Sequence, residues 1–593
     1  MLFGRHINRY YLRYSWILLL GIAALVLVDW FQLKVPELYR MVINGMNTGY
    51  VGVNGQSVPF DARFLIEEIC LPLIVIILVM VTGRFLWRVC FFGSSIKVES
   101  DLRNRMFDRS KDLSQQYFRS NKVGNMMSLF TNDLETVQQC FGDGILMLCD
   151  AVFLGALTIY KMWKMDVTLT LLSLIPMALL MASGAIISRY MMKKWALRQQ
   201  AFSDLSDFSQ ESFSGISVIK AFVREAGELL SFRRLNKRNE EVNVDYTKAA
   251  TLLNITVTLF VESVTCIILG YGGYLVYRGS FDAGQLVEYI GYFSTIVWPV
   301  MAVSQLIEMT SRGKASLGRI GELLEAQPDV KDADGAVDIT GARGEIEFRG
   351  LTFTYPDGER PALEDMSFKI AAGEHVGIVG RTGSGKTTIA DLIVRTYNVP
   401  DGTLFIDGKD VNTLTLRSVR AACTYVPQDN FLFCDSIENN IAFAADSLEH
   451  GEVERAAALA AVDDNIGQFP DGYSTVIGER GVTLSGGQKQ RISIARALLK
   501  NAAIAIFDDA ASAVDTATEK IILDNLRDFR KYRTTILIAH RISTVEDMDR
   551  IIFISDGRVR ATGTHALLYA SCPEYRSIVD LQKLEEEGRE NNA

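Results

Sequence analysis

The chain has 593 residues, a formal net charge of −9 and a hydrophobic content of 49%, with a mean hydropathy of +0.14. The acidic balance and the lack of a basic tail or stripe argue against a nucleic-acid-binding protein, and the hydropathy is high for a soluble one. The length suits a membrane bundle joined to one soluble domain, so transmembrane spans are the first feature to seek.

The N-terminal segment MLFGRHINRYYLRYSW is basic and aromatic, which is typical of a segment at the membrane surface. The apolar run after it is long and lacks a small-residue cleavage site, which predicts a retained helix rather than a cleaved signal peptide. The eight cysteines are scattered and form no CxxC pair. We interpret them as reduced residues that pack as small hydrophobes.

Six apolar segments reach the roughly 20 residues that a transmembrane helix needs. They cover about 16–36, 65–87, 141–163, 166–190, 251–277 and 284–308. The connections after the second and the fourth segment are long, charged and poor in Pro and Gly, which predicts helices that continue well out of the bilayer.

Positive charge orients this bundle. Residues 88–122 hold eight Lys or Arg and residues 193–248 hold ten, whereas the loop 37–64 holds only Arg40 and Arg63. The positive-inside rule therefore places both long connections and the N-terminus in the cytoplasm. An even number of spans returns the C-terminal half to the same side, so we expect a multi-pass protein of the cytoplasmic membrane.

The composition changes from about Gly344, where short β-rich runs alternate with helical patterns and Gly/Asp turns. This alternation predicts an α/β domain with a mostly parallel sheet. We expect a transmembrane domain over 1–312, a linker over 313–343, the α/β domain over 344–582 and a tail over 583–593, whose polar sequence predicts disorder.

The stretch GRTGSGKTT at 380–388 fits the G-x-x-x-x-G-K-[ST] pattern, after the apolar strand HVGIV and before the helical TIADLIV. Its glycines let backbone N–H groups face phosphates, while Lys386 supplies a positive charge and Thr387 a hydroxyl for Mg²⁺. The expected fold is therefore an α-helical six-span transmembrane bundle with long cytoplasmic helical extensions, followed by an α/β P-loop nucleotide-binding domain.

Further motifs narrow the class of P-loop protein. Asp508 ends the apolar strand AIAIF and fits the carboxylate that acts on Mg²⁺ through water. The others are YVPQDNFLF with Gln428 after a strand, LSGGQKQR at 484–491 before a helix, SAVD at 512–515, LIAHR with His540 at a strand end, and Tyr355 upstream of the loop, able to stack on adenine.

With these motifs the chain resembles the half-transporters of the ATP-binding cassette (ABC) exporters, of the multidrug-resistance-like type, over nearly its whole length. The resemblance implies ATP and Mg²⁺ as cofactors, and these roles: adenine stacking by Tyr355; ATP binding by Gly380, Arg381, Thr382, Gly383, Ser384, Gly385, Lys386, Thr387 and Thr388; Mg²⁺ binding by Thr387, Gln428 and Asp508; a signature acting in trans, Leu484, Ser485, Gly486, Gly487 and Gln488; a D-loop, Ser512, Ala513, Val514 and Asp515; and a switch histidine, His540.

The same resemblance implies that VIGERG at 476–481 senses the membrane domain, and that helix-turn tips near 114–124 and 211–222 dock on cassettes. It also implies that two cassettes close head to tail. Each ATP then lies between the Walker A loop of one chain, residues 380–388, and the signature of the other. A Gly-rich signature that opens a helix forms an anion site. Such a site has no use within one monomer, so the LSGGQ stretch itself predicts a dimer.

The residue after Asp508 departs from the family pattern. The usual residue is Glu, but this chain has Asp509, which sets the carboxylate back by one C–C bond, roughly 1.5 Å. A misplacement of about 1 Å costs about 10²-fold in rate, so we expect this Walker site to bind ATP and to hydrolyse it slowly. The stretch DDAASAVD is similar to the degenerate-site subunit of bacterial heterodimeric exporters. His540, which some such subunits replace, is retained, and a weakly active homodimer stays an alternative.

The sequence says less about the substrate. Asp29, Asp150 and Glu262 are ionisable residues within the spans, where such residues are costly and often face a cavity. Two or more of them in a cavity favour cationic amphiphiles, whereas snorkelling or a buried pair is the structural alternative. We expect ATP-driven export of amphiphilic small molecules (drug-like, lipid or peptide) by a subunit surrounded by membrane lipid. A homodimeric exporter or lipid flippase and an ATP-gated channel or sensor are the alternatives.

Overall fold

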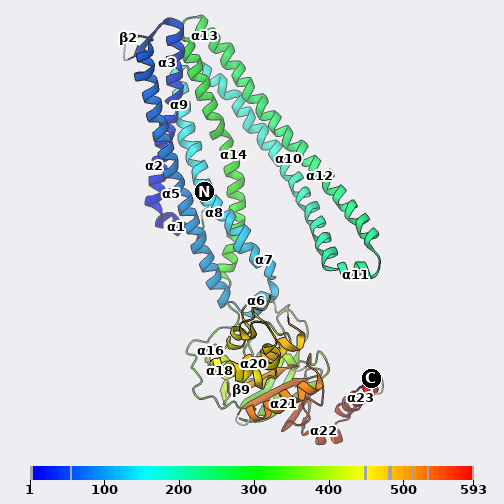
Figure 1. The fold of residues 1–593 in the computed structure, drawn as a ribbon. Coiled ribbons are helices and arrows are strands. Elements are labelled where there is room, and N and C mark those ends of the chain that lie inside the picture. Colours follow the sequence, from blue (N-terminus) through cyan, green and yellow to red (C-terminus); the bar gives the residue numbers. More distant parts are fainter. Residues whose placement is uncertain are drawn as a thin grey trace. The chain divides into compact units, whose positions relative to one another are not determined.

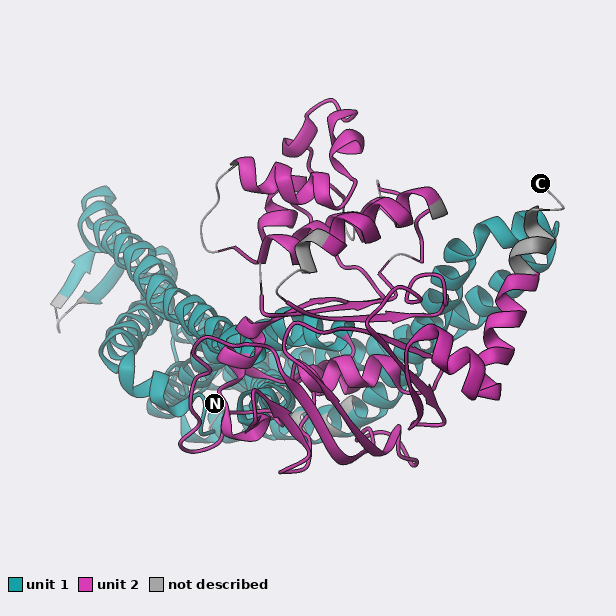
Figure 2. Ribbon diagram, turned by 90° about the horizontal axis from the view of Figure 1, so that it is seen from below, with its two compact units in different colours: residues 1–111, 123–326 teal, residues 112–122, 327–593 magenta. Residues whose placement is uncertain are grey.

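The structure is a computed structural model that describes residues 4–53, 56–445, 450–478, 484–500, 502–510, 512–530 and 533–590. The chain divides into two compact units, shown in different colours in Figure 2. Residues 1–111 and 123–326 form the helical membrane unit, and residues 112–122 and 327–593 form the α/β unit. A short segment of the N-terminal half, 112–122, therefore belongs with the α/β unit.

Six helical stretches among the described residues are long and apolar enough to cross a membrane. This confirms the six predicted spans, and each stretch is longer than its predicted segment: Ser15–Thr48, Ala62–Asp112, Val123–Met165, Val167–Ser214, Glu225–Tyr277 and Ala283–Glu325. These long helices are the blue, cyan and green ribbons in Figure 1.

The stretches are built from consecutive helices, several of which contain short π-helical segments. The elements are α1 (Asn8–Arg13), α2 (Ser15–Gln32), α3 (Val35–Thr48), the hairpin β1 (Tyr50–Val53) and β2 (Gln56–Pro59), α4 (Ala62–Phe64), η1 (Leu65–Cys70), α5 (Leu71–Asp112), α7 (Val123–Ser128), η2 (Leu129–Asp133), α8 (Leu134–Cys149), η3 (Asp150–Leu154), α9 (Gly155–Met165), α10 (Val167–Ser214), α11 (Ile216–Ala221), α12 (Glu225–Ile267), η4 (Ile268–Gly272), α13 (Gly273–Tyr277) and α14 (Ala283–Glu325).

Helices α10 and α12 lie side by side (Figure 1) and are joined by the short helix α11. The continuation of the helical pattern beyond the apolar windows was predicted from the charged, Pro-poor connections. Helix α14 runs to Glu325, so the first part of the expected linker 313–343 is helical. The other domain limits that were inferred from the sequence stay predictions.

One polar cluster connects α3 to α9 through hydrogen bonds. The Glu37 carboxylate accepts a hydrogen bond from Lys34 Nζ at 2.9 Å and another from Lys161 Nζ, on α9, at 2.5 Å. Charge bias places this end of the bundle outside the cell.

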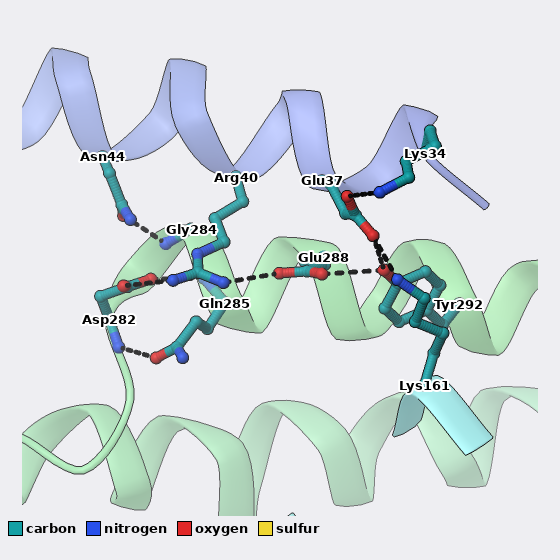
Figure 3. Close-up of polar contacts among 10 residues, drawn as sticks. All are labelled: Lys34, Glu37, Arg40, Asn44, Lys161, Asp282, Gly284, Gln285, Glu288 and Tyr292. Atoms are coloured by element: carbon teal, nitrogen blue, oxygen red, sulfur yellow. Dashed lines mark hydrogen bonds and ion pairs between the residues drawn. The ribbon is translucent and has the colours of Figure 1, made fainter. Parts of the chain in front are cut away.

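The same cluster continues from α3 to α14 (Figure 3). Glu288, which is 5% exposed, accepts hydrogen bonds from Arg40 at 3.3 Å and from the Tyr292 hydroxyl at 2.8 Å. Arg40 also lies 3.9 Å from Asp282, whose carboxylate caps the first turn of α14. With Lys34, Lys161 and Glu37, this outer polar cluster pairs three cations with three carboxylates.

The α/β unit contains a six-stranded sheet in the order β12-β11-β5-β10-β9-β8 and a four-stranded sheet in the order β4-β3-β6-β7. In the first sheet β11, β5, β10, β9 and β8 run parallel, and β12 pairs antiparallel at the edge. The strands are β3 (Ile346–Phe353), β4 (Leu363–Ile370), β5 (His375–Gly380), β6 (Leu404–Ile406), β7 (Lys409–Asp410), β8 (Cys423–Val426), β9 (Ile504–Asp508), β10 (Thr534–Ala539), β11 (Arg550–Ser555) and β12 (Arg558–Gly563). The predicted mostly parallel α/β domain is confirmed.

Strands β5, β9 and β10 are apolar along nearly their whole length because both faces of the sheet are covered. The remaining elements are α6 (Gln115–Ser120), α15 (Lys386–Ile393), η5 (Val411–Thr413), α16 (Leu416–Ala422), α17 (Ile437–Ala442), α18 (His450–Leu459), α19 (Asp463–Gly467), η6 (Gly472–Ser474), α20 (Gly486–Lys500), α21 (Thr516–Arg530), α22 (His565–Ser571) and α23 (Pro573–Glu590).

The expected disorder of the tail is wrong as far as Glu590, because α23 continues to that residue. The buried side chains Tyr575 and Val579 anchor the helix to the core of the α/β unit. The residues that follow are mostly Leu, Lys, Gln and Glu, which have high helix propensity.

Candidate nucleotide site

The parallel register brings the predicted site residues to one edge of the six-stranded sheet. Ile538 of β10 pairs with Asp508 of β9, and Val426 of β8 pairs with Phe507. His540 and Gln428 each follow their strand by one or two residues. Since the carboxyl ends of parallel strands share one edge, motifs more than a hundred residues apart in the sequence meet here.

The loop between β5 and α15 has the conformation that its glycines allow. Gly383 has a φ of +81° and Gly385 a φ of +96°, both in the left-handed region that side chains disfavour. Lys386 Nζ donates to the carbonyl oxygens of Gly380 at 2.8 Å and Arg381 at 3.0 Å. The ammonium group is thus held over the loop at the start of the helix, where phosphates bind in P-loop proteins.

Burial lowers the pKa of Lys386, and the nearby Asp508 and Asp509 oppose that shift. The Ser384 hydroxyl is buried without a hydrogen-bond partner among the described residues. Together with Arg381, Thr382 and Gly383, Ser384 also lines a pocket of about 350 Å³. A buried hydroxyl without a partner at this position fits a phosphate oxygen as its missing partner.

Asp508 lies at the end of β9 with 2% of its surface exposed. Its Oδ2 atom has no hydrogen-bond partner among the described residues. Burial raises the pKa of this carboxyl and the neighbouring Asp509 adds to the rise, while the Thr387 hydroxyl, Lys386 and His540 lower it. A buried carboxylate oxygen beside a threonine hydroxyl fits the oxygen ligands that Mg²⁺ prefers.

Asp509 and His540 line one cavity of about 180 Å³, together with Ser512, Glu519 and Thr544. The structure therefore brings the two predicted catalytic positions to one space, which is large enough for water. Asp509 has a φ of +51°, a conformation that Asp tolerates better than Glu. Gln428 is exposed beside this edge of the sheet.

The signature opens α20 with a reciprocal cap. Ser485 Oγ accepts from the Gln488 backbone N–H at 3.3 Å, and Gln488 Oε1 accepts from the Ser485 N–H at 2.9 Å. Leu484 is buried and anchors the stretch. The cap fixes the Gly-rich N-terminus of a helix of 15 residues, as an anion site requires.

Gln490, two residues after the signature, was missed by the sequence analysis. It is 2% exposed, and its side chain donates to the Asp509 carbonyl at 2.7 Å and accepts from the Ala513 N–H at 3.0 Å. A single amide thus joins the signature helix to both Asp509 and the D-loop. The carbonyl of Ala513 also lies 2.9 Å from where a Cβ on Gly487 would be.

The Tyr355 side chain contacts other residues of the α/β unit in this structure. Its hydroxyl hydrogen-bonds to Thr388 at 2.8 Å, and the guanidinium of Arg119 stands 5.4 Å from its ring centroid. Arg119 comes from α6 and also donates to the Tyr397 hydroxyl at 2.6 Å. Arg119 thus lies beside Tyr355 within the α/β unit, whereas the docking of the tip at 114–124 and adenine stacking stay predictions. The contact of Arg119 could not be read from its sequence position.

Two other predicted elements have limited descriptions. Residues 479–481 of the VIGERG stretch lie outside the described residues, as does Ala511 before the D-loop. The tip at 211–222 forms the turn through α11, and its docking stays a prediction. Gln582 of α23, which was not singled out, donates to the His540 carbonyl at 2.7 Å and so holds the switch loop.

Comparison with known proteins decides the family. Residues 17–300 match the ABC transporter transmembrane region, and residues 363–512 match the ABC transporter family. The chain belongs to the ABC transporter family. As an ABC exporter half-transporter, it is an ATPase coupled to transport, spans the cytoplasmic membrane six times and carries its ATP-binding cassette in the cytoplasm.

Its relatives cover nearly the whole exporter. It is 34% identical to the multidrug resistance-like ATP-binding protein MdlA of Escherichia coli, over 97% of this chain and 96% of that one. It is also 34% identical to an ATP-dependent lipid A-core flippase of Syntrophus aciditrophicus, over 86% and 85%. A solved bacterial Atm1-family ABC exporter with ATP bound superimposes with a TM-score of 0.76, 28% identity, and coverage of 97% and 98%.

The three ionisable residues expected in the spans of the exporter divide into two groups. Asp29 on α2 is 3% exposed and interacts electrostatically with Asp150, the first residue of η3. Glu262 lies on α12 with its side chain exposed. Their role in a substrate cavity stays a prediction.

Proposed function

We propose that this exporter is one subunit of a heterodimer that expels amphiphilic small molecules, and that its own Walker site binds ATP but hydrolyses it slowly. The observation that carries this proposal is Asp509 at the position of the catalytic carboxylate, beside His540, in a chain whose LSGGQ signature is complete. A complete signature is needed only if a neighbouring site uses it.

The slow hydrolysis follows from the short side chain of Asp509. Asp509 holds its carboxylate roughly 1.5 Å short of the position that Glu reaches, and a displacement of about 1 Å costs about 10²-fold in rate, or about 2.7 kcal/mol of barrier. ATP binding survives, because Lys386, Thr387 and Asp508 are in place. The site therefore keeps its nucleotide through many turnovers of the other site.

Thr387, Gln428 and Asp508 are the residues that would hold Mg²⁺ at this site, as the free Oδ2 of Asp508 supports. When bound, the ion supplies charge neutralisation for the phosphate oxygens. In this proposal the chain's own residues bind and orient the nucleotide: the loop amides and Lys386 bind the phosphates, and Asp509 and His540, which line one cavity, are the residues that act on the attacking water.

The roles cross over in the dimer. Ser485, Gly486, Gly487 and Gln488 of this chain complete the competent site on the partner, because the capped N-terminus of α20 presents N–H groups and a positive dipole end. A homodimer is the second candidate, favoured by the retained His540.

Two relatives bear on the substrate class. One relative is named for multidrug resistance and another as a lipid A-core flippase, and these names support an amphiphilic substrate. A homodimeric lipid flippase is therefore an alternative, as is an ATP-gated channel or sensor. The complete signature and His540 favour a pump, since a channel does not need them.

The test compares ATP hydrolysis by the purified single chain with hydrolysis by the chain co-expressed with a second half-transporter that carries Glu after its Walker B Asp. The proposal expects at least about 10²-fold more turnover in the pair. Robust turnover by the single chain would establish the homodimer and overturn the slow-site assignment. A pair that binds ATP without moving any amphiphile into vesicles would support the channel or sensor.

A further inference from the structure

Two carboxylates meet inside the membrane unit. Asp29, from the middle of the first spanning stretch, is 3% exposed, and its Oδ2 atom has no hydrogen-bond partner among the described residues. Asp150, within the third stretch, interacts with it electrostatically. A buried carboxylate oxygen without a partner is costly in protein and more so within a bilayer.

The charge of this pair is not balanced. Among the described residues, Arg84 on α5 is the cation that interacts electrostatically with both carboxylates, and it donates to Gln32 Oε1 at 3.4 Å. With one cation for two carboxylates, the ionised cluster carries one excess negative charge. The outer polar cluster of Figure 3 is the contrast, because there three cations meet three carboxylates.

An aromatic side chain stands at the same place. Trp298 of α14 donates through Nε1 to Asp150 Oδ2 at 3.2 Å, while 44% of the residue stays exposed. This contact holds the carboxylate at the edge of the indole ring. The carboxylate and the ring face both attract organic cations. Asp150 also begins the π-helical segment η3, and such segments are frequent at functional sites.

We propose that Asp29 and Asp150, with the face of Trp298, form the binding site for the cationic group of the exported amphiphile. The inference rests on the proposed export function and names its substrate class. An organic cation supplies the missing charge and the missing partner of Asp29. Its apolar part lies against the surrounding spanning helices, whose side chains are largely hydrophobic.

The test measures equilibrium binding of radiolabelled tetraphenylphosphonium and tetraphenylborate to the full chain with its partner subunit in lipid nanodiscs. The two ions have the same shape and opposite charge, so their difference reports the charge of the site. We expect Asp29→Asn and Asp150→Asn each to weaken tetraphenylphosphonium binding by about tenfold or more and not to weaken tetraphenylborate binding. Asp29→Glu, which restores the charge, should recover much of the affinity.

Glu68→Gln is the matched control, since it removes one exposed carboxylate from η1 of the second spanning stretch, outside this pair. It should leave tetraphenylphosphonium binding unchanged. Equal loss in all three variants would show an effect of total charge and overturn the proposal. Unchanged binding in Asp29→Asn, in protein that elutes as a single peak, would show that Asp29 is a protonated packing residue and would also overturn it.

The binding measurement separates this inference from the proposed function. If charge-selective binding depends on Asp29 and Asp150 but the pair moves no amphiphile, the export proposal fails and the site stands. If the pair exports amphiphiles and the asparagine variants bind and export the cation normally, the site fails and the export proposal stands.

Discussion

A glutamate in place of Asp509 would gain reach but would be disfavoured by the backbone conformation. The longer carboxylate of Glu would reach further into the cavity that His540 lines, but the φ of +51° disfavours side chains other than Asp or Asn. The strain costs about 1 kcal/mol, which is small beside the barrier of about 2.7 kcal/mol that the short reach adds. Reach therefore decides the rate.

We predict that Asp509→Glu raises the slow-site hydrolysis in the assembled transporter by roughly 10-fold to 10²-fold. Single-turnover hydrolysis of ATP held in this chain's Walker site is the measurement. Asp509→Asn is the control and should lower the slow-site rate further, since the charge is lost. No gain from the glutamate would show that the partner's signature limits this site.

A second carboxyl near the nucleotide site is pH-sensitive. Burial and repulsion by Asp508 raise the pKa of Asp391, on α15, to about 6, although Arg119 opposes the shift. The unfolded value is about 3.9, so the folded state holds the proton more tightly. Stability is then highest below about pH 4 and falls as pH rises to about 6.

We predict that Asp391→Asn, which mimics the protonated carboxyl, stabilises the cassette above about pH 6 by roughly 1–3 kcal/mol. Its thermal unfolding midpoint should exceed that of the unaltered protein at pH 8, by a margin that shrinks toward pH 5. Asp524→Asn, at an exposed carboxylate of α21, is the control and should shift neither midpoint. An equal gain at both pH values would contradict the assignment of the effect to protonation.

At the scale of elements, helix α20 and strand β9 act as one unit through Gln490. The amide satisfies the carbonyl of Asp509 and the N–H of Ala513, so the signature helix cannot shift without moving the residues that serve the chain's own site. In the proposed dimer the signature serves one site and Asp509 the other. Gln490 is therefore placed to link the two sites.

We predict that Gln490→Leu lowers the free energy of unfolding of the cassette by about 1–3 kcal/mol, because it removes both hydrogen bonds of a buried amide, one to the Asp509 carbonyl and one from the Ala513 N–H. Hydrolysis at both sites of the assembled transporter should also slow, which a loss of stability alone does not produce below the unfolding midpoint. Gln468→Leu, at an exposed glutamine of the same cassette, should change neither quantity. Full activity in Gln490→Leu would remove the proposed link.

The elements that could be predicted are those with a local signal. Long apolar runs gave the six spans, and turn-bounded apolar strands gave the sheet whose edge gathers Gly380, Asp508 and His540. The partners Arg119, Gln490 and Gln582 could not be predicted, because each acts through a tertiary contact that no local pattern encodes. The pairing of Asp29 with Asp150 depends on helix packing and is likewise absent from the sequence pattern.

At the scale of the whole molecule, a membrane unit and a cassette share one chain. In the proposed head-to-tail dimer the capped signature serves the nucleotide of the partner, and the chain's own Walker site has Asp509 in place of the usual glutamate. A heterodimer makes this chain's signature essential and its Asp509 dispensable for turnover. A homodimer makes both essential.

The last prediction separates these two assemblies. A Cβ added at Gly486 would lie 3.7 Å from Ala513 Cβ, the nearest atom found for it among the described residues, so the first atom of an Asp side chain fits there and Gly486→Asp introduces negative charge at the N-terminus of α20. The added carboxylate should repel the phosphate bound to the partner and lower steady-state ATP hydrolysis of the pair by about 10²-fold or more. Asp509→Asn should lower the same rate by less than about threefold, because a site slowed 10²-fold contributes only about 1% of the turnover. Comparable losses from both variants would show that the two sites are equivalent, as in a homodimer.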